Sequence, residues 1–216
     1  MTKIDASSID TMFDYLSKSS PLNHSDWALV FGRADRLVAD KTEELLRAGL
    51  VDYAMIVGGI GKDSGSLARL AIPEAHYLGA LLVDRPGFPV DKLYVEAKPT
   101  NGGECLEMGL GRIANEGLAH NGLTLVIHPT SLRRIMAQCE AVAGRIGFTT
   151  KHPLQGVGTD YEFDPERLID QKEAAAELLR LADWPAKGWC VAQNDLPLDL
   201  VETARAYDSA WKAEKK

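Results

Sequence analysis

The sequence is poor in cysteine. Its three cysteines, Cys105, Cys139 and Cys190, lie far apart and form no Cys-x-x-Cys pair. An odd number argues against a disulfide framework, and their spacing fits no zinc site. The five histidines show no metal-ligand spacing with one another either. We therefore expect reduced, mostly buried thiols and no bound metal.

Long apolar runs and dense basic clusters are also missing. No apolar stretch approaches the roughly 20 residues that a membrane-spanning helix needs, and the amino terminus lacks the pattern of a secretory signal. The formal net charge is −7, whereas proteins that grip the phosphates of DNA or RNA normally carry a basic face. The sequence thus predicts a cytoplasmic protein that binds a small molecule, and neither nucleic acid nor a membrane.

Several well-known site motifs are absent as well. The glycines at 58–61 match neither the GxGxxG spacing of dinucleotide-binding turns nor the spacing of a P-loop. No GxSxG nucleophile elbow occurs, and no cysteine has a histidine close to it in sequence. Covalent catalysis therefore has no positive support.

What the sequence does contain is an alternation of strand and helix patterns over most of its 216 residues. Short apolar runs typical of buried strands occupy residues 27–31, 53–57, 92–96 and 123–127, with a shorter fifth strand expected at 148–150. Amphipathic or capped helices are expected at 35–48, 73–83, 106–116 and 131–145. This order predicts an α/β fold, a Rossmann-like three-layer sandwich with a mostly parallel sheet.

The pattern changes in the last third of the chain. Residues 155–161 are glycine-rich and irregular, and a helix is expected at 164–181 with Asp164 as its N-cap. We predict a Rossmann-like core with an N-terminal helix over residues 1–153. Residues 154–216 are then expected to form a smaller, mostly helical C-terminal subdomain that packs on the core.

Chemically interesting residues follow the predicted strands, and parallel sheets bind ligands outside the carboxyl ends of their strands. Gly58, Gly59 and Gly61 follow the second strand, and Glu74 begins a later helix. Glycines at such a turn allow backbone N–H groups to approach an anion. Many tight strand–helix turns need glycine for steric reasons alone, so both interpretations stay open.

The segments after the third and fourth strands allow two interpretations too. Thr100 or Asn101 can cap the next helix with Glu104 in its first turn, or the same segment can contact a ligand. Arg133 and Arg134 stand near a helix start, where the helix dipole disfavours cations. An anionic ligand would compensate, although a solvated surface pair is the ordinary alternative. His128 could shuttle protons, but a lone histidine is more often structural.

Taken in order, these pieces resemble the YdcF-like family, which is related to the SanA and ElyC envelope proteins. The matching pieces are Gly-Gly-Ile-Gly at 58–61, Glu-Ala at 74–75, Glu96, Thr-Asn-x-Gly-Glu at 100–104 and Pro-Thr-x-x-Arg-Arg at 129–134, within roughly residues 27–150. The resemblance implies a Rossmann-like sheet with a ligand crevice, for which S-adenosylmethionine or a nucleotide-like ligand has been proposed. The predicted ligand-binding residues are Gly58, Gly59, Gly61, Glu74, Glu96, Thr100, Asn101, Glu104, Thr130, Arg133 and Arg134.

Two positions depart from the family pattern. Cys105 stands where the family often has asparagine, and Ser131-Leu132 replaces a run that carries a histidine in many members. If that histidine is catalytic elsewhere, this protein is expected to bind its ligand without turning it over.

Three functions remain open at this point. The leading hypothesis is the binding of a small anionic or nucleotide-like ligand, with the glycine turns, helix N-termini and Arg133 and Arg134 holding the anion. Glu96 or Glu104 would accept hydrogen bonds from ribose hydroxyls or an ammonium group. The second is a hydrolase or transferase acting on a phosphorylated or amide small molecule, with Glu74 or Glu104 as general base. The third is a non-catalytic regulatory domain.

Overall fold

Five parallel strands form one sheet in the order β3-β2-β1-β4-β5. The computed structural model describes residues 5–61 and 64–214. The strands are β1 (Ser25–Phe31), β2 (Val51–Val57), β3 (Leu93–Glu96), β4 (Leu123–Ile127) and β5 (Gln155–Gly158). The first four lie within two residues of their predicted positions and pair as parallel neighbours, which confirms the predicted α/β fold.

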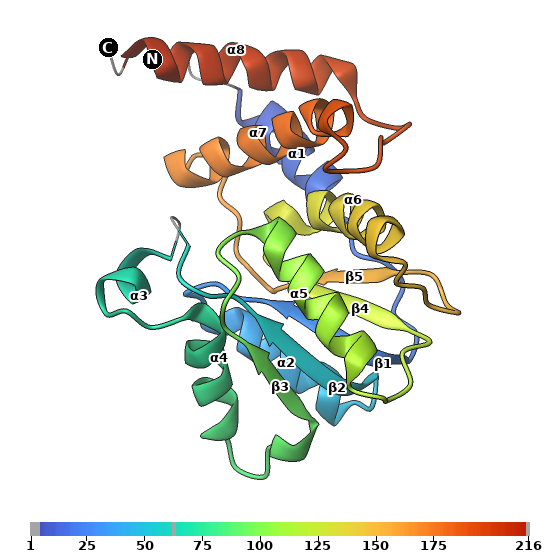
Figure 1. Cartoon of the computed structure of the whole chain (residues 1–216). Coiled ribbons are helices and arrows are strands. Elements are labelled where there is room, and N and C mark those ends of the chain that lie inside the picture. The colour runs from blue at the N-terminus through green and yellow to red at the C-terminus, as the bar shows by residue number, and fades with distance from the viewer. Residues whose placement is uncertain (1–4, 62–63, 215–216) are drawn as a thin grey trace.

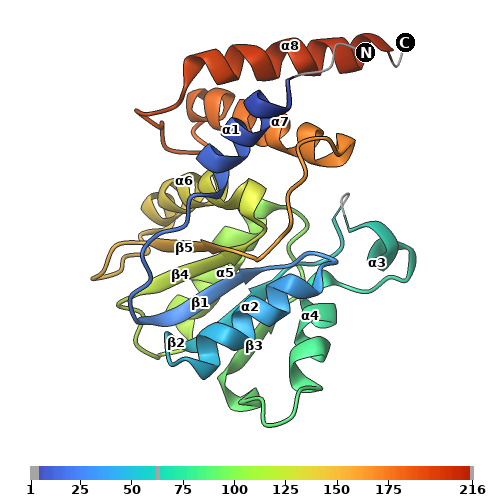
Figure 2. The ribbon, with the colours of Figure 1, turned by 180° about the vertical axis from the view of Figure 1, so that it is seen from behind.

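Helices cover both faces of the sheet, because successive strand residues point to opposite sides. The helices are α2 (Arg36–Arg47), α4 (Glu74–Val83), α5 (Gly102–Asn115) and α6 (Pro129–Ile146). In β1, Trp27 and Leu29 pack toward α5 and α6, whereas Ala28 and Val30 pack toward α2 and α4. Figures 1 and 2 show the two covered faces from opposite sides. The result is a Rossmann-like three-layer sandwich.

A further group of helices stacks on the outside of α6. The apolar side chains of α1, α7 and α8 share one core cluster, which Ala137 of α6 joins. These helices are α1 (Ala6–Ser17), α7 (Leu168–Asp183) and α8 (Leu198–Glu214); the short elements are α3 (Gly65–Arg69), η1 (Val90–Lys92) and η2 (Pro185–Lys187). The N-terminal helix therefore packs with the C-terminal helices rather than on the sheet (Figure 1).

The fifth strand lies at Gln155–Gly158, so the prediction at 148–150 was wrong. This strand has two glycines and one strongly apolar residue, which hides it from sequence patterns. The glycines are needed because α6 packs closely on it. A Cβ on Gly156 would lie 2.5 Å from Met136 Sδ, and one on Gly158 would lie 3.0 Å from Pro129 Cβ. The sheet therefore extends past residue 153, the predicted boundary of the core.

The prediction of Asp164 as a helix N-cap was also wrong, since α7 begins at Leu168. Asp164 Oδ1 accepts a hydrogen bond from the N–H of Glu166 (2.9 Å), and its carbonyl accepts one from Arg167 (3.0 Å). Its own N–H donates to the carboxylate of Asp170 at 2.9 Å. Asp164 thus stabilises a separate turn that precedes the helix.

Across residues 5–61 and 64–214 no helix has the length and apolar character needed to cross a bilayer. The same described residues contain no cluster of three or more histidine, cysteine, aspartate or glutamate side chains arranged to hold a metal ion. Cys105, Cys139 and Cys190 are free and buried.

Candidate functional site

All five strands end at one edge of the sheet, and the loops that leave this carboxyl edge position the candidate site. From β1 the chain order runs outward to β2 and β3 on one side and to β4 and β5 on the other. The loops after β1 and β4 therefore diverge, which makes a topological switch point between these two strands. The candidate site has one half at the ends of β1–β3 and another at the ends of β1, β4 and β5.

Glu74 stands at the centre of the first half, over the ends of β1 and β2. The N–H groups of Glu74 and Ala75 donate to the carbonyls of Gly59 (3.1 Å) and Gly58 (2.8 Å), which fixes the start of α4 there. A Cβ on Gly32 would lie 2.7 Å from Glu74 Cβ and 3.0 Å from its Oε2. Glycine at the end of β1 thus makes room for this carboxylate, while Ser64 Oγ donates to its Oε1 at 2.8 Å.

The glycines of the 58–61 turn meet steric demands rather than forming an anion cradle. The N–H groups of Gly58 and Gly59 donate to the carbonyls of Glu96 (3.0 Å) and Pro99 (2.6 Å), and that of Gly61 donates to Ser64 Oγ (2.8 Å). These three donors are engaged within the chain. The prediction that they hold an anion is thereby corrected in favour of the packing interpretation.

Thr100, Asn101 and Glu104 form the N-terminal cap of α5. Asn101 Oδ1 accepts from the N–H of Glu104 at 3.1 Å, and Glu104 Oε2 accepts from Thr100 N (2.7 Å) and Oγ1 (2.9 Å). These bonds from Thr100 lower the pKa of Glu104, which makes its carboxylate a weaker base. The structure therefore favours the capping interpretation for this segment.

Glu96 ends β3 and is largely turned toward α5. Its Oε2 lies 3.8 Å from Arg112 on that helix, and its Oε1 accepts from the N–H of Lys98 at 3.2 Å. The side chain of Glu96 is 12% exposed. It borders the edge beside Glu74 but already has a cationic partner.

Two of the carboxylates in this half act electrostatically on Cys105 of α5. Burial raises the pKa of its thiol to about 12, and the negative charges of Glu74 and Glu104 add to the increase. The thiol therefore stays protonated at neutral pH and is no nucleophile. The charges that act on this thiol are both negative.

Arg133 and Arg134 face the outer helices, which corrects their predicted role as an anion clamp. Arg133 bonds to both carboxylate oxygens of Asp195 (2.5 and 2.6 Å) and stacks 3.9 Å from the ring centroid of Tyr15 in α1. Arg134 is 9% exposed and forms an ion pair with Glu177 of α7. Their charges are thus used to hold α1 and α7 against α6.

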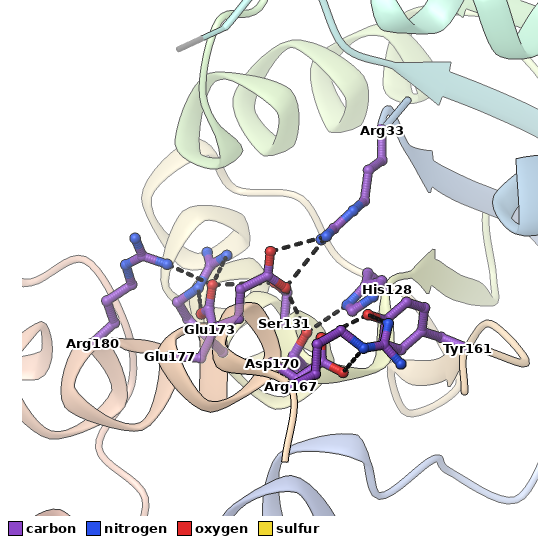
Figure 3. A network of polar contacts seen from close by, with 11 residues as sticks. Arg33, His128, Ser131, Tyr161, Arg167, Asp170, Glu173, Glu177 and Arg180 are labelled. Atoms are coloured by element: carbon purple, nitrogen blue, oxygen red, sulfur yellow. Dashed lines mark hydrogen bonds and ion pairs between the residues drawn. The ribbon is translucent and has the colours of Figure 1, made fainter. Parts of the chain in front are cut away.

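Figure 3 shows a polar network at the other half of the edge, across the switch point. Arg33, two residues after β1, lies 3.0 Å from Glu173 of α7. Glu173 also accepts from Thr130 Oγ1 at 3.5 Å, and Thr130 Oγ1 bonds to His128 Nδ1. The ring of His128 lies 4.3 Å from that of Tyr161 between centroids. Thr130, a predicted ligand residue, is buried within this network.

Helix α7 places three acidic side chains along the switch-point half of the edge. Asp170 accepts from Tyr161 OH (2.6 Å), and Glu177 accepts from Arg180 (2.6 Å) and Ser131 (3.2 Å). Together with Glu173 they recur at helical spacing on one face of α7. Asp170 and Glu177 are both at most 5% exposed. This row joins the outer helices to the edge of the sheet.

Comparison with protein-family models and with curated proteins finds no match for this chain. The resemblance to the YdcF-like family therefore stays a prediction. Any function must be argued from the geometry of the carboxyl edge itself.

Only some of the predicted ligand-binding residues lie together at the carboxyl edge. Gly58 and Glu74 meet at the ends of β1 and β2, and Gly59 and Gly61 pack against the loop that leads to α5. Sequence reasoning missed Gly32, Ser64 and Glu173. Gly32 directly follows an apolar strand, which is a usable signal; Glu173 lies inside a helix, where no local pattern marks it.

Proposed function

We propose that the protein binds a small nucleoside-like molecule at the carboxyl edge of its sheet, with the carboxylate of Glu74 accepting hydrogen bonds from hydroxyl or ammonium groups. The observation that carries the proposal is the placement of Glu74 over Gly32 and Gly58, at the ends of β1 and β2. The carboxylate of Glu74 accepts from Ser64 Oγ at 2.8 Å, and we expect a donor of the ligand to join this contact. S-adenosylmethionine and adenosine carry such donors and are the probes of choice.

The electrostatics support a ligand rich in donors over a phosphate. The backbone N–H groups at Gly58, Gly59 and Gly61 donate within the chain, and Arg133 and Arg134 have carboxylate partners. The charges that act on the nearby thiol of Cys105 are negative. These contacts favour a ribose or an ammonium group over a bare phosphate.

Glu74→Gln should weaken the binding of S-adenosylmethionine by about 1.5–3 kcal/mol, or roughly 10- to 150-fold, because it removes a charge-assisted acceptor. Isothermal titration calorimetry measures this change directly. Glutamine keeps the shape of the side chain and can still accept from Ser64, so the fold should be retained. The matched control is Glu202→Gln, an exposed residue of α8 away from the edge, which should leave the affinity unchanged.

Equal affinities for the wild type and Glu74→Gln would remove Glu74 from the site. Failure of wild type to bind S-adenosylmethionine or adenosine would contradict the proposed ligand class as a whole.

For Arg133→Ala we expect the opposite result, namely a loss of stability without a loss of affinity. Since Arg133 is paired with Asp195 and Tyr15, its loss should leave the affinity for S-adenosylmethionine unchanged. The melting temperature should fall by about 2–4 °C, because a partly exposed ion pair with a cation–π contact contributes about 1 kcal/mol. Calorimetry and thermal unfolding of the same preparation test both parts. A tenfold loss of affinity with an unchanged melting temperature would restore the anion-clamp interpretation.

A further inference from the structure

Two buried polar atoms lack a hydrogen-bond partner among the side chains of residues 5–61 and 64–214. They are His128 Nε2 and Thr159 Oγ1, in residues that are 2% and 6% exposed. A buried polar atom without a partner costs about 1–3 kcal/mol, so such atoms are rare in native proteins. Their shared location at the carboxyl edge therefore calls for a physical explanation.

The two atoms belong to neighbouring strands and to the same side of the sheet. Ile127 of β4 pairs with Gly158 of β5, so His128 and Thr159 are the next residues in register. Val126 and Val157 both belong to the core cluster on the α2 and α4 face. Because side chains point alternately to the two faces along a strand, His128 and Thr159 lie on that same face.

The hydrogen-bond chain favours one tautomer of His128. Thr130 Oγ1 lies 3.5 Å from Glu173, whose carboxylate only accepts. When the single hydroxyl proton of Thr130 points to Glu173, Nδ1 of His128 is the donor in its bond to Thr130 Oγ1. Nε2 then carries the lone pair. Burial, followed by the charge of Arg33, lowers the pKa of His128 to about 3, so the ring is neutral at physiological pH.

A hydroxyl group satisfies both atoms at once, since it donates one hydrogen bond and accepts others. It can donate to the lone pair of His128 Nε2 and accept from Thr159 Oγ1. We propose that these two side chains form a buried subsite for one hydroxyl group of the small molecule bound at the carboxyl edge. This inference rests on the proposed function, and it assigns a hydroxyl-bearing ligand to the switch-point half of the edge.

Adenosine and 2′,3′-dideoxyadenosine differ only in the 2′- and 3′-hydroxyls and so provide the test for a subsite that takes one of these two groups. Wild type should prefer adenosine by several-fold to about tenfold in calorimetric titrations, the range for one neutral hydrogen bond. His128→Phe should lower this preference several-fold relative to wild type, and Thr159→Val provides a second variant if His128→Phe does not fold. In ¹⁵N NMR spectra of the wild type, adenosine should shift the Nε2 resonance of His128, and the dideoxy compound should not.

The outcomes separate the subsite from the proposed function. A preference that persists in His128→Phe and Thr159→Val but is lost in Glu74→Gln overturns the subsite and upholds the function of Glu74. An Nε2 resonance that adenosine does not shift although adenosine binds also overturns the subsite. Absence of binding by wild type to either nucleoside or S-adenosylmethionine overturns the proposed function and, with it, the subsite.

Discussion

Arg134→Ala is expected to lower the free energy of unfolding by about 3–5 kcal/mol, because it leaves a buried carboxylate without its main partner. Arg134 pairs with Glu177, which is 5% exposed, and also donates to Gln138 Oε1 at 3.1 Å. Burial alone would raise the pKa of Glu177, but the charges and hydrogen bonds of Arg134 and Arg180 outweigh it and leave the pKa lowered. The carboxylate thus stays charged and depends on these partners.

Denaturant unfolding followed by circular dichroism measures this loss. The matched control is Arg145→Ala on the same helix, whose pair with Glu107 is about half exposed and should contribute less than about 1 kcal/mol. Removing both buried charges together, in Arg134→Met with Glu177→Met, should recover most of the stability. An Arg134→Ala variant as stable as Arg145→Ala would refute the assignment of this pair as the attachment of α7 to α6.

Gly59→Ala is expected to cost about 2–3 kcal/mol of stability. The new Cβ would lie 2.7 Å from the carbonyl oxygens of Ala97 and Pro99 and 3.0 Å from that of Lys98. Overpacking of this kind costs about 1–3 kcal/mol, and the upper part of the range applies because backbone oxygens cannot turn aside as flexible side chains do. The effect should appear as a lower denaturant midpoint without any ligand present.

Gly111→Ala is the control for this substitution. A Cβ at Gly111, inside α5, meets nothing within 4 Å. Alanine should therefore stabilise the helix by about 0.5–1 kcal/mol. If Gly59→Ala instead kept full stability and lost affinity for S-adenosylmethionine, the glycine turn would belong to the ligand site after all.

The fold was largely predictable from the sequence because its central strands are buried on both faces. For that reason Trp27–Phe31 is a continuous apolar run, and Leu123–Ile127 is interrupted only by Thr124. The misplaced strand β5 shows the limit of such patterns. Gly156 and Gly158 are set by the close approach of α6, a tertiary demand that no local propensity reveals.

The candidate site was less predictable than the fold. Glu74 and the glycine turn could be predicted as site residues because both lie between one predicted strand and the next. Their place in the sequence does not, however, distinguish a residue that contacts a ligand from one that caps a helix. Glu104 is engaged by Thr100 and Asn101 within its own segment. Arg133 and Arg134 are engaged by Asp195 and Glu177, which lie far away in sequence. Long-range partners of this kind become visible only once the outer helices are placed.

A crystal structure of the protein with S-adenosylmethionine or adenosine shows directly whether the ligand binds at Glu74. We expect ordered ligand density against the carboxylate of Glu74, where Gly32 and Gly58 end β1 and β2, with a hydroxyl or ammonium group within hydrogen-bond distance of that carboxylate. Ligand density elsewhere on the molecule, for example beside Arg133 and Asp195, would contradict it. So would an edge that stays empty at concentrations far above the dissociation constant measured in solution.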